Sequence, residues 1–430
     1  MNNPNAYPPL GIVHLGTELR DKGEEVVLHD MTWDRDYEPV REVIERVKPE
    51  FVGLSTLSIA YQVSQRVAEI AEEFQVGSIV LGGAHACTRP VGWRYEVVPG
   101  PYDFRPDLIP DRSLLPTFRH YLKQNPGFPY LMPWTYIIAS RGCPFNCSFC
   151  QPMLRKLWGR RTVHRTVDSV YTEIENLVRE YGLASYTFMD DTMISDEIWL
   201  TALCGRLKGI GRPWTCQTNV RTVTWDKLRM MKEAGCYFIG FGVETGSEWI
   251  NKFVYNKPQT NKQVRQVFEM CGKLDILTEA TLIIGAPEDT EFTINQTAEL
   301  IKEVSPDVID LHVLTPTPGS SLFDKYTREG KFKNSDARFS NRYTFGVLQC
   351  ELDEREIRRG YWKIVRSWLE GKSVWRTKAA WGGWFGSLRG VFTKVEGMVR
   401  WVIYHNYFWH RVLKEGVWLG RRLGNRWFGW

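Results

Sequence analysis

The sequence predicts an α/β protein with three parts: a shortened, doubly wound parallel-sheet domain, a partial (β/α)6 barrel of the TIM type, and a basic, tryptophan-rich C-terminal extension. Short apolar runs alternate with helical patterns in the first two parts, which is typical of parallel strands covered by helices. The second part repeats this helix and strand pair without interruption, which favours closure into a barrel. A change of composition near Tyr361 marks the extension.

The first domain is predicted over residues 1–99, followed by a linker over 100–134 that is rich in proline and aromatic residues. Its expected elements are helix 8–23, strand 24–30, helix 40–47, strand 51–55, helix 63–74 and strand 78–83. This order indicates a parallel sheet covered on both faces. In such a sheet, ligands bind at the carboxyl ends of the strands.

The barrel is predicted over residues 135–330. Six strands are expected, over 136–139, 185–191, 214–219, 237–244, 279–285 and 308–313. Helices are expected between them, over 167–180, 197–207, 225–234, 262–273 and 293–303. Function is expected at the carboxyl ends of these strands.

The extension, residues 331–430, holds most of the basic charge. From Arg355 onward there are 16 Lys and Arg against 4 Asp and Glu, which leaves 39 against 46 in the first 354 residues. Ten of the 18 tryptophans lie between Trp362 and Trp430. Tryptophan with arginine favours the headgroup zone of a membrane, so a peripheral membrane contact is one interpretation. A helical cap that packs its aromatic rings on the barrel is the other, and nucleic-acid binding is not expected.

The chain begins Met-Asn-Asn-Pro-Asn, without a basic start and an apolar core, so no signal peptide is expected. It contains no run of eighteen apolar residues, and thus no predicted membrane-spanning helix. Nine cysteines without paired spacing favour a reducing compartment. We therefore expect a cytoplasmic protein, peripheral to the membrane if the extension binds lipid.

Three cysteines stand within eight residues, Cys143, Cys147 and Cys150, directly after an apolar strand. Thiolates so close together indicate ligands of a soft metal centre, and three ligands suit an iron-sulfur cluster with one open iron. A structural zinc site normally needs a fourth Cys or His, and residues 151–161 supply neither. The other cysteines, such as Cys216 and Cys236, are scattered and are interpreted as core residues.

The spacing Cys-x3-Cys-x2-Cys, with Arg-Gly before it and Phe149 before the third cysteine, resembles the signature of radical S-adenosylmethionine (radical SAM) enzymes. The resemblance implies that Cys143, Cys147 and Cys150 hold a 4Fe-4S cluster. It also implies that the open iron chelates the amino and carboxylate groups of SAM. An electron from the cluster would then release a 5'-deoxyadenosyl radical.

Polar residues lie at the ends of successive barrel strands, where this resemblance places the SAM site. Asp190 or Asp191 would meet the SAM amino group, and Arg221 its carboxylate. Glu244 would meet the ribose and Gly285 the adenine. The loop 315–324 after the last strand is expected to border the substrate. No catalytic residue is identified.

The first hundred residues resemble the cobalamin-binding domain of one large subgroup of these enzymes, through the segments 8–11, 53–56 and 82–85. The residues expected at the cobalamin are Ser55, Thr56, Gly82, Gly83 and His85. For His85 a core or surface role is preferred to cobalt ligation. Only seven residues precede Pro8 and the domain is short after His85, so a degenerate sheet without the cofactor remains an alternative.

The resemblance implies a cobalamin-dependent radical SAM enzyme that modifies an unactivated carbon, with C-methylation as the preferred reaction. The extension suggests a lipophilic small molecule or lipid as substrate, such as a hopanoid, an isoprenoid lipid or a tetrapyrrole. Methylation of a protein side chain, and cyclisation or rearrangement without methyl transfer, are alternatives. An electron donor of the flavodoxin or ferredoxin type is the expected partner. A non-catalytic iron-sulfur electron carrier is the alternative from another class.

Overall fold

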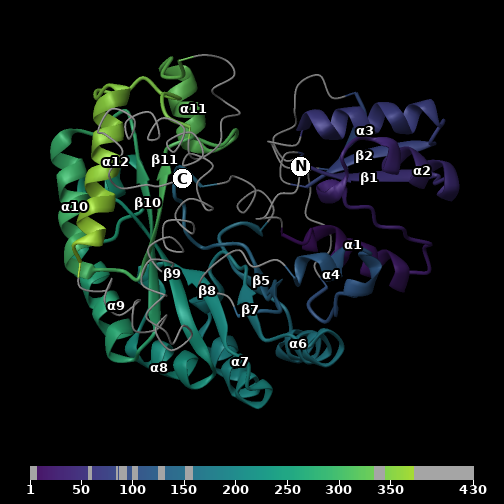
Figure 1. Cartoon of the computed structure of the whole chain (residues 1–430), viewed down its shortest axis with the longest axis horizontal. Coiled ribbons are helices and arrows are strands. Elements are labelled where there is room, and N and C mark those ends of the chain that lie inside the picture. Colours follow the sequence, from purple (N-terminus) through teal and green to yellow (C-terminus); the bar gives the residue numbers. More distant parts are fainter. Residues whose placement is uncertain are drawn as a thin grey trace, which may run out of the picture.

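The computed structural model describes residues 7–56, 61–83, 86, 94–98, 105–123, 131–150, 158–333 and 344–371. It contains a three-stranded sheet beside a six-stranded one (Figure 1). The smaller sheet has the order β1-β2-β3 and is parallel throughout. Its elements are α2 (Glu38–Val47), β1 (Phe51–Ser55), α3 (Tyr61–Glu73), β2 (Ser78–Gly82) and β3 (Glu96–Val97).

The larger sheet is an open half-barrel with the order β11-β10-β9-β8-β7-β4, and all of its pairings are parallel. Its strands are β4 (Trp134–Ile137), β7 (Ser185–Phe188), β8 (Trp214–Thr218), β9 (Cys236–Glu244), β10 (Leu277–Ile284) and β11 (Val308–Val313). The helices between them are α6 (Val167–Tyr181), α7 (Glu197–Ile210), α8 (Trp225–Glu233), α9 (Asn261–Lys273) and α10 (Glu291–Val304). The six predicted strands and five predicted helices are confirmed.

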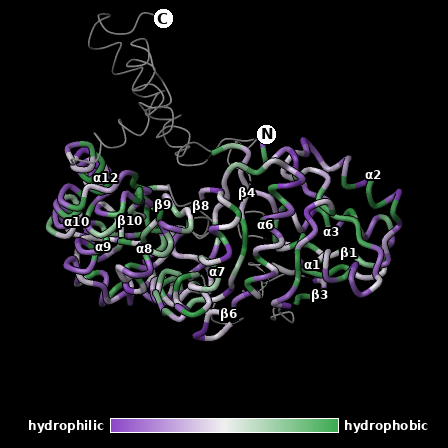
Figure 2. Tube along the Cα trace, turned by 90° about the horizontal axis from the view of Figure 1, so that it is seen from below, coloured by the Kyte–Doolittle hydropathy of each residue, from purple (hydrophilic) through white to green (hydrophobic). Residues whose placement is uncertain are grey.

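Each of these five helices begins after a Thr or Asp whose side chain accepts a backbone N–H of the first turn, namely Thr166, Asp196, Thr224, Thr260 and Thr290. Such N-caps fix where each helix starts, and therefore where the preceding loop ends. The helices lie along the outer side of the sheet (Figure 1). In β10 the residues on the helix side are buried and those on the other side are half-buried, so the inner side of the half-barrel stays accessible. Hydrophobic stretches run through the strands, as Figure 2 shows.

The first helix, α1 (Leu10–Asp21), packs on the barrel edge instead of on the small sheet. Leu10 contacts Trp134, Tyr136 and Ile138 of the β4 region. The predicted strand over 24–30 is wrong: these residues are extended in pattern but pair with no strand in the described chain. The apolar side chain of Leu28 does face inward, since it packs on Gly16 of α1. A β-ladder, however, needs a second strand beside the first.

A buried ion cluster joins the segment before β4 to the first barrel helix. The Glu173 carboxylate of α6 receives hydrogen bonds from Arg112 and from Arg165, whose Nη1 lies 2.5 Å from Glu173 Oε2. The same guanidinium groups donate to the backbone oxygens of Tyr136 and Ile138, at 3.0 Å each. Burial would raise the pKa of Glu173, but the two arginines hold this pKa at about 2.

Three elements near the site were not predicted. The short strands β5 (Ser140–Arg141) and β6 (Val163–His164) pair antiparallel, and α11 (Ser321–Arg328) follows β11. The helix α12 (Glu354–Leu369) packs along α10 and buries Tyr361 and Trp368 in the barrel core. The helical-cap interpretation of the extension therefore holds for its described part. Residues 372–430, with the other tryptophans, lie outside the described chain.

None of the helices described here combines the length and the apolar character needed to cross a bilayer.

We predict that Glu173→Gln lowers the free energy of unfolding by about 3–5 kcal/mol, because it leaves two buried arginines without their counter-charge. The stabilisation from Glu173 is present above its unfolded pKa near 4.5 and is lost as the pH falls toward about 2. The free energy of unfolding of the variant should therefore fall less steeply than that of the wild type as the pH decreases. Denaturant titration between pH 3 and pH 7 measures both effects. Glu175→Gln, at an exposed position of the same helix, should change the free energy by less than about 0.5 kcal/mol.

Candidate active site

The three clustered cysteines lie in a loop that starts at the carboxyl end of the β4 region. The pairing of β5 with β6 closes the base of this loop. Gly142 directly before Cys143 has a φ of +86°, and a Cβ atom there would overlap the Arg161 carbonyl oxygen and lie 2.8 Å from Trp158 Cβ. Only glycine fits this turn without strain, which explains the Arg-Gly pair before the first cysteine.

Two other segments hold the middle of the loop. Ser148 donates its N–H to the Tyr255 oxygen at 2.9 Å and its hydroxyl to the Val254 oxygen at 2.5 Å. Its own carbonyl oxygen accepts the Leu322 N–H of α11 at 2.9 Å. The Phe149 ring packs edge-on against Tyr255, with centroids 5.2 Å apart. The loop is therefore anchored between its second and third cysteines.

The thiols differ in exposure: Cys143 and Cys147 are half-buried and Cys150 is exposed. Cys143 Sγ lies 3.0 Å from Thr192 Oγ1. No group of three Cys, His, Asp or Glu in the described chain converges tightly enough to hold a single metal ion. A 4Fe-4S cluster does not need this, since each of its thiolates binds a different iron atom. Three thiols on one anchored loop fit such a cluster.

Charged groups from other strand ends lie close to Cys147. Burial raises the pKa of the Cys147 thiol; Lys257 and Arg221 act against this shift, while Glu244 and the Cys143 thiol add to it. Arg221 follows β8 and stacks on the Phe145 ring of the cysteine loop, with its guanidinium carbon 4.8 Å from the ring centroid. The structure thus brings two of the predicted SAM residues, Arg221 and Glu244, to the cysteine loop.

The two aspartates after β7 have different surroundings. The Asp190 carboxylate is buried and accepts hydrogen bonds from the backbone of Ala139 and from the backbone and hydroxyl of Ser140. Burial raises the pKa of Asp190 to about 6, although these donors favour its charged form. Asp190 therefore ties the end of β4 to the end of β7. Asp191, by contrast, is exposed and lies beside Arg141 and Gly142 at the start of the cysteine loop.

Gly285 directly follows β10 and has a φ of +89°. Its N–H and that of Ala286 donate to the buried Asp289 carboxylate at 2.7 and 3.0 Å, and Asp289 also accepts the Thr293 hydroxyl of α10. Asp289, which the sequence had not singled out, thus fixes the turn at Gly285. A carboxylate four residues after a strand-ending glycine is the available sequence signal.

Lys257 is the second residue that was missed. It is buried, and its Nζ lies 2.5 Å from Glu244 Oε1 and 2.7 Å from the Gly242 oxygen. The position in the sequence, between Asn256 and Pro258 in a polar turn, does not distinguish it from an exposed lysine. Only the folded chain reveals the pair.

In the smaller sheet, Ser55 of β1 is paired in register with Gly82 of β2. A Cβ atom on Gly83 would lie 2.8 Å from the Thr56 backbone nitrogen and 3.1 Å from Ser55 Oγ. Four of the five residues predicted for cobalamin therefore meet at the carboxyl ends of β1 and β2. His85 lies outside the described residues. A glycine pair at this edge leaves room for close approach of a ligand to the backbone.

The loop after β11 leads into α11, which carries Leu322 to the cysteine loop. Residues 321–324 of the predicted loop form the first turn of α11, and a substrate contact of residues 315–324 stays a prediction. The scattered cysteines Cys204, Cys216, Cys236 and Cys271 are buried in the core. This confirms that Cys216 and Cys236 pack as core residues.

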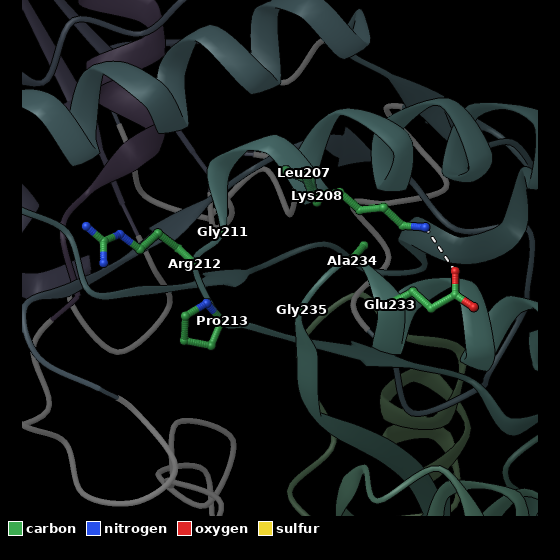
Figure 3. A pocket seen from close by; sticks show the side chains of 8 residues that line it. All are labelled: Leu207, Lys208, Gly211, Arg212, Pro213, Glu233, Ala234 and Gly235. Carbon is green, nitrogen blue, oxygen red and sulfur yellow. Dashed lines mark hydrogen bonds and ion pairs between the residues drawn. The ribbon is translucent and has the colours of Figure 1, made fainter.

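A shallow hollow of about 320 Å³ lies at the opposite end of the sheet, beside the starts of β8 and β9 (Figure 3). Its rim carries the Lys208–Glu233 ion pair, at 2.9 Å. Because the cysteines and charged residues lie at the carboxyl ends of the strands, this hollow does not belong to the candidate site.

Two known families match parts of the chain. The Radical SAM superfamily matches residues 137–301, and the B12 binding domain matches residues 3–100. The chain is a radical SAM enzyme with an N-terminal B12-binding domain. The cofactors of this radical SAM enzyme are a 4Fe-4S cluster, SAM and cobalamin, and its reaction needs an electron donor and a substrate.

Relatives of this radical SAM enzyme are distant. An uncharacterized methyltransferase of Pyrococcus horikoshii is 26% identical over 74% of this chain and 78% of the relative. An anaerobic magnesium-protoporphyrin IX monomethyl ester cyclase of Cereibacter sphaeroides is 24% identical over 74% of this chain, which spans 60% of that protein. The solved structure of the radical SAM methyltransferase TsrM from Kitasatospora setae, with cobalamin and a 4Fe-4S cluster bound, has a TM-score of 0.61. It is 15% identical and covers 76% of this chain and 74% of its own, so it supports the fold.

We predict that Cys147→Ala, reconstituted without oxygen, loses most of the about four iron atoms per chain that the wild type binds. The reason is that a cluster with two protein ligands is held too weakly to survive desalting. Iron analysis and the visible absorbance of the cluster measure the loss. Cys204→Ala, which removes a buried thiol from α7, should retain its iron. Equal iron in the two variants would exclude Cys147 as a ligand.

Proposed function

We propose that this protein is a cobalamin-dependent C-methyltransferase that acts on an unactivated carbon of a lipophilic substrate: a hopanoid, an isoprenoid lipid or a tetrapyrrole. The observation that carries the proposal is the grouping around Cys147. A half-buried thiol, the Cys143 thiol, one carboxylate and two cations come together there from four separate segments. Such a mixture suits a cluster that holds a zwitterionic ligand.

We assign SAM to the strand ends as follows. Asp191 would accept hydrogen bonds from its ammonium group, and the Arg221 guanidinium would bind its carboxylate. The Glu244 carboxylate would accept from the ribose diol, and the backbone at Gly285 would border the adenine. Cys143, Cys147 and Cys150 would hold the cluster, which together with SAM supplies a 5'-deoxyadenosyl radical. No side chain in this assignment needs to act as an acid or base, since positioning the target carbon is the main task of the protein.

The edge formed by Ser55, Thr56, Gly82 and Gly83 would bind cobalamin, which supplies the methyl group. The buried Thr56 hydroxyl lies 2.5 Å from the buried Ser64 hydroxyl, and this contact holds the end of β1 beside the first turn of α3. His85 remains a candidate contact.

The substrate class rests on two observations. The extension is basic and rich in tryptophan, which suits contact with a lipid surface. One relative is named for a tetrapyrrole substrate, magnesium-protoporphyrin IX monomethyl ester. That relative is a cyclase, which keeps cyclisation without methyl transfer as a second candidate reaction. Methylation of a protein side chain is a further alternative.

We propose that a flavodoxin or a ferredoxin supplies the electron that reduces the cluster. We place the enzyme in the cytoplasm, peripheral to the membrane through residues 372–430.

We predict that the reconstituted enzyme, with cobalamin, dithionite and SAM labelled in its methyl group, forms 5'-deoxyadenosine and transfers the label to cobalamin. Arg221→Met should weaken SAM binding by at least about tenfold, because it removes a charge-assisted contact worth about 1.5–3 kcal/mol. Arg229→Met, at an exposed arginine of α8, is the matched control and should bind SAM like the wild type.

Two other results would redirect the proposal. Formation of 5'-deoxyadenosine by a protein that keeps no cobalamin after desalting would favour cyclisation or rearrangement. A reduced cluster whose electron paramagnetic resonance spectrum does not change on addition of SAM would contradict the SAM site itself.

We further predict that the full chain floats with anionic liposomes and that a chain ending at Gly371 does not, because the truncation removes eight of the ten tryptophans of the extension. The cut lies after α12, so the described barrel stays whole. Equal flotation of both chains would remove the membrane assignment.

A further inference from the structure

The segment 250–259, which follows β9, contacts both the cysteine loop and the end of β9. It opens with a single turn of π-helix, Ile250–Val254. Single π-turns are rare and often lie at functional sites. Toward the cysteine loop, Val254 and Tyr255 accept the two hydrogen bonds from Ser148, and Asn256 Nδ2 donates to the Asn146 oxygen at 2.7 Å.

Toward β9, three side chains of this segment donate to the backbone oxygens at the strand end. Asn251 donates to Val243 and Thr245, Gln259 donates to Val243 at 2.6 Å, and Lys257 donates to Gly242. These oxygens need outside donors because β9 has a bulge here: Gly242 pairs with Thr281 and Glu244 already with Leu282. The extra residue, Val243, leaves the regular ladder.

The bulge gives Glu244 a φ of +63°, which is uncommon for a residue with a side chain. Its carboxylate is buried and bonded through Oε1 to Lys257, and within the described chain Oε2 has no hydrogen-bond partner. The pair crosses over Gly242, where a Cβ atom would overlap both the ammonium and the carboxylate. The ion pair between Glu244 and Lys257 therefore depends on three unusual features: a bulge, a glycine and a buried lysine.

We propose that Lys257 is a positioning residue that holds the Glu244 carboxylate through Oε1, so that Oε2 points to the ribose of SAM. This inference rests on the proposed SAM site. Lys257 itself would not touch SAM; its ammonium holds the buried carboxylate in one orientation. The same segment anchors Ser148, so the ribose contact and the cluster are held by one short piece of chain.

The physical reason is the cost of a buried carboxylate without a partner. Without the Lys257 ammonium, the Glu244 side chain is free to turn away, and this change removes the acceptor from the ribose. A residue that acts only through another has no effect once that other residue is gone.

The experiment is a double-mutant cycle on SAM binding, measured by equilibrium binding to the reconstituted, oxidised cluster. Lys257→Met should raise the dissociation constant of SAM by at least about tenfold, and Glu244→Gln by a similar factor. The double variant should stay within about twofold of Glu244→Gln, since Lys257 then has no carboxylate to hold. All variants should retain their iron, because no cysteine changes.

Gln259→Met is the matched control. It removes a buried donor to the same strand end but leaves the Lys257–Glu244 pair in place. We expect a loss of stability and a dissociation constant within about threefold of the wild type. If Lys257→Met fails to fold, Lys257→Gln retains a donor for the Gly242 oxygen without the charge, and the same outcomes apply.

Three results would overturn the inference without contradicting the SAM site. These are a wild-type dissociation constant of SAM in Lys257→Met, an equal increase of this constant in Gln259→Met, or an increase in the double variant that equals the product of the two single increases. A wild type that holds its cluster but does not bind SAM would instead contradict the proposed function.

Discussion

The cysteine loop keeps its shape because its backbone is hydrogen-bonded to the turn that follows β9. Ser148, between the second and third cysteines, bonds through its N–H, its hydroxyl and its carbonyl oxygen to Tyr255, Val254 and Leu322. A loop with three thiols and little secondary structure of its own would otherwise sample many arrangements. These bonds also fix its distance from Glu244, because Lys257 belongs to the same turn.

Two other strand ends are held by buried carboxylates that accept hydrogen bonds from the backbone. Asp190 connects β7 to the end of the β4 region through the backbone of Ala139 and Ser140. Asp289 connects the turn at Gly285 to the start of α10. Each carboxylate is buried and satisfied by backbone N–H groups, so it stabilises a strand end and is not available to a ligand. Among the described strand-end residues, Asp191, Arg221 and Glu244 Oε2 are not used in this way, and these are the groups to which we assign SAM.

The Glu173 ion cluster attaches the segment before β4 to the barrel. Arg112, which lies before β4, and Arg165, which lies before α6, share one carboxylate and also bond backbone oxygens of the β4 region. The helix α1 covers the same edge of the sheet through Leu10. The edge of the half-barrel at β4 is thereby covered by α1.

The sequence by itself determined the cluster-binding motif and the order of the six barrel strands, because thiol spacing and apolar periodicity are local properties. It also placed Ser55 with Gly82, and Arg221 and Glu244 with the cysteines, because parallel strands bring their carboxyl ends to one edge. Only the tertiary structure separated Asp190 from Asp191 and found Lys257, since both results depend on which backbone groups lie opposite a side chain. It also showed that residues 24–30 pair with no strand of the described chain. Their alternation matches a strand, but a strand forms only where a second one supplies hydrogen-bond partners.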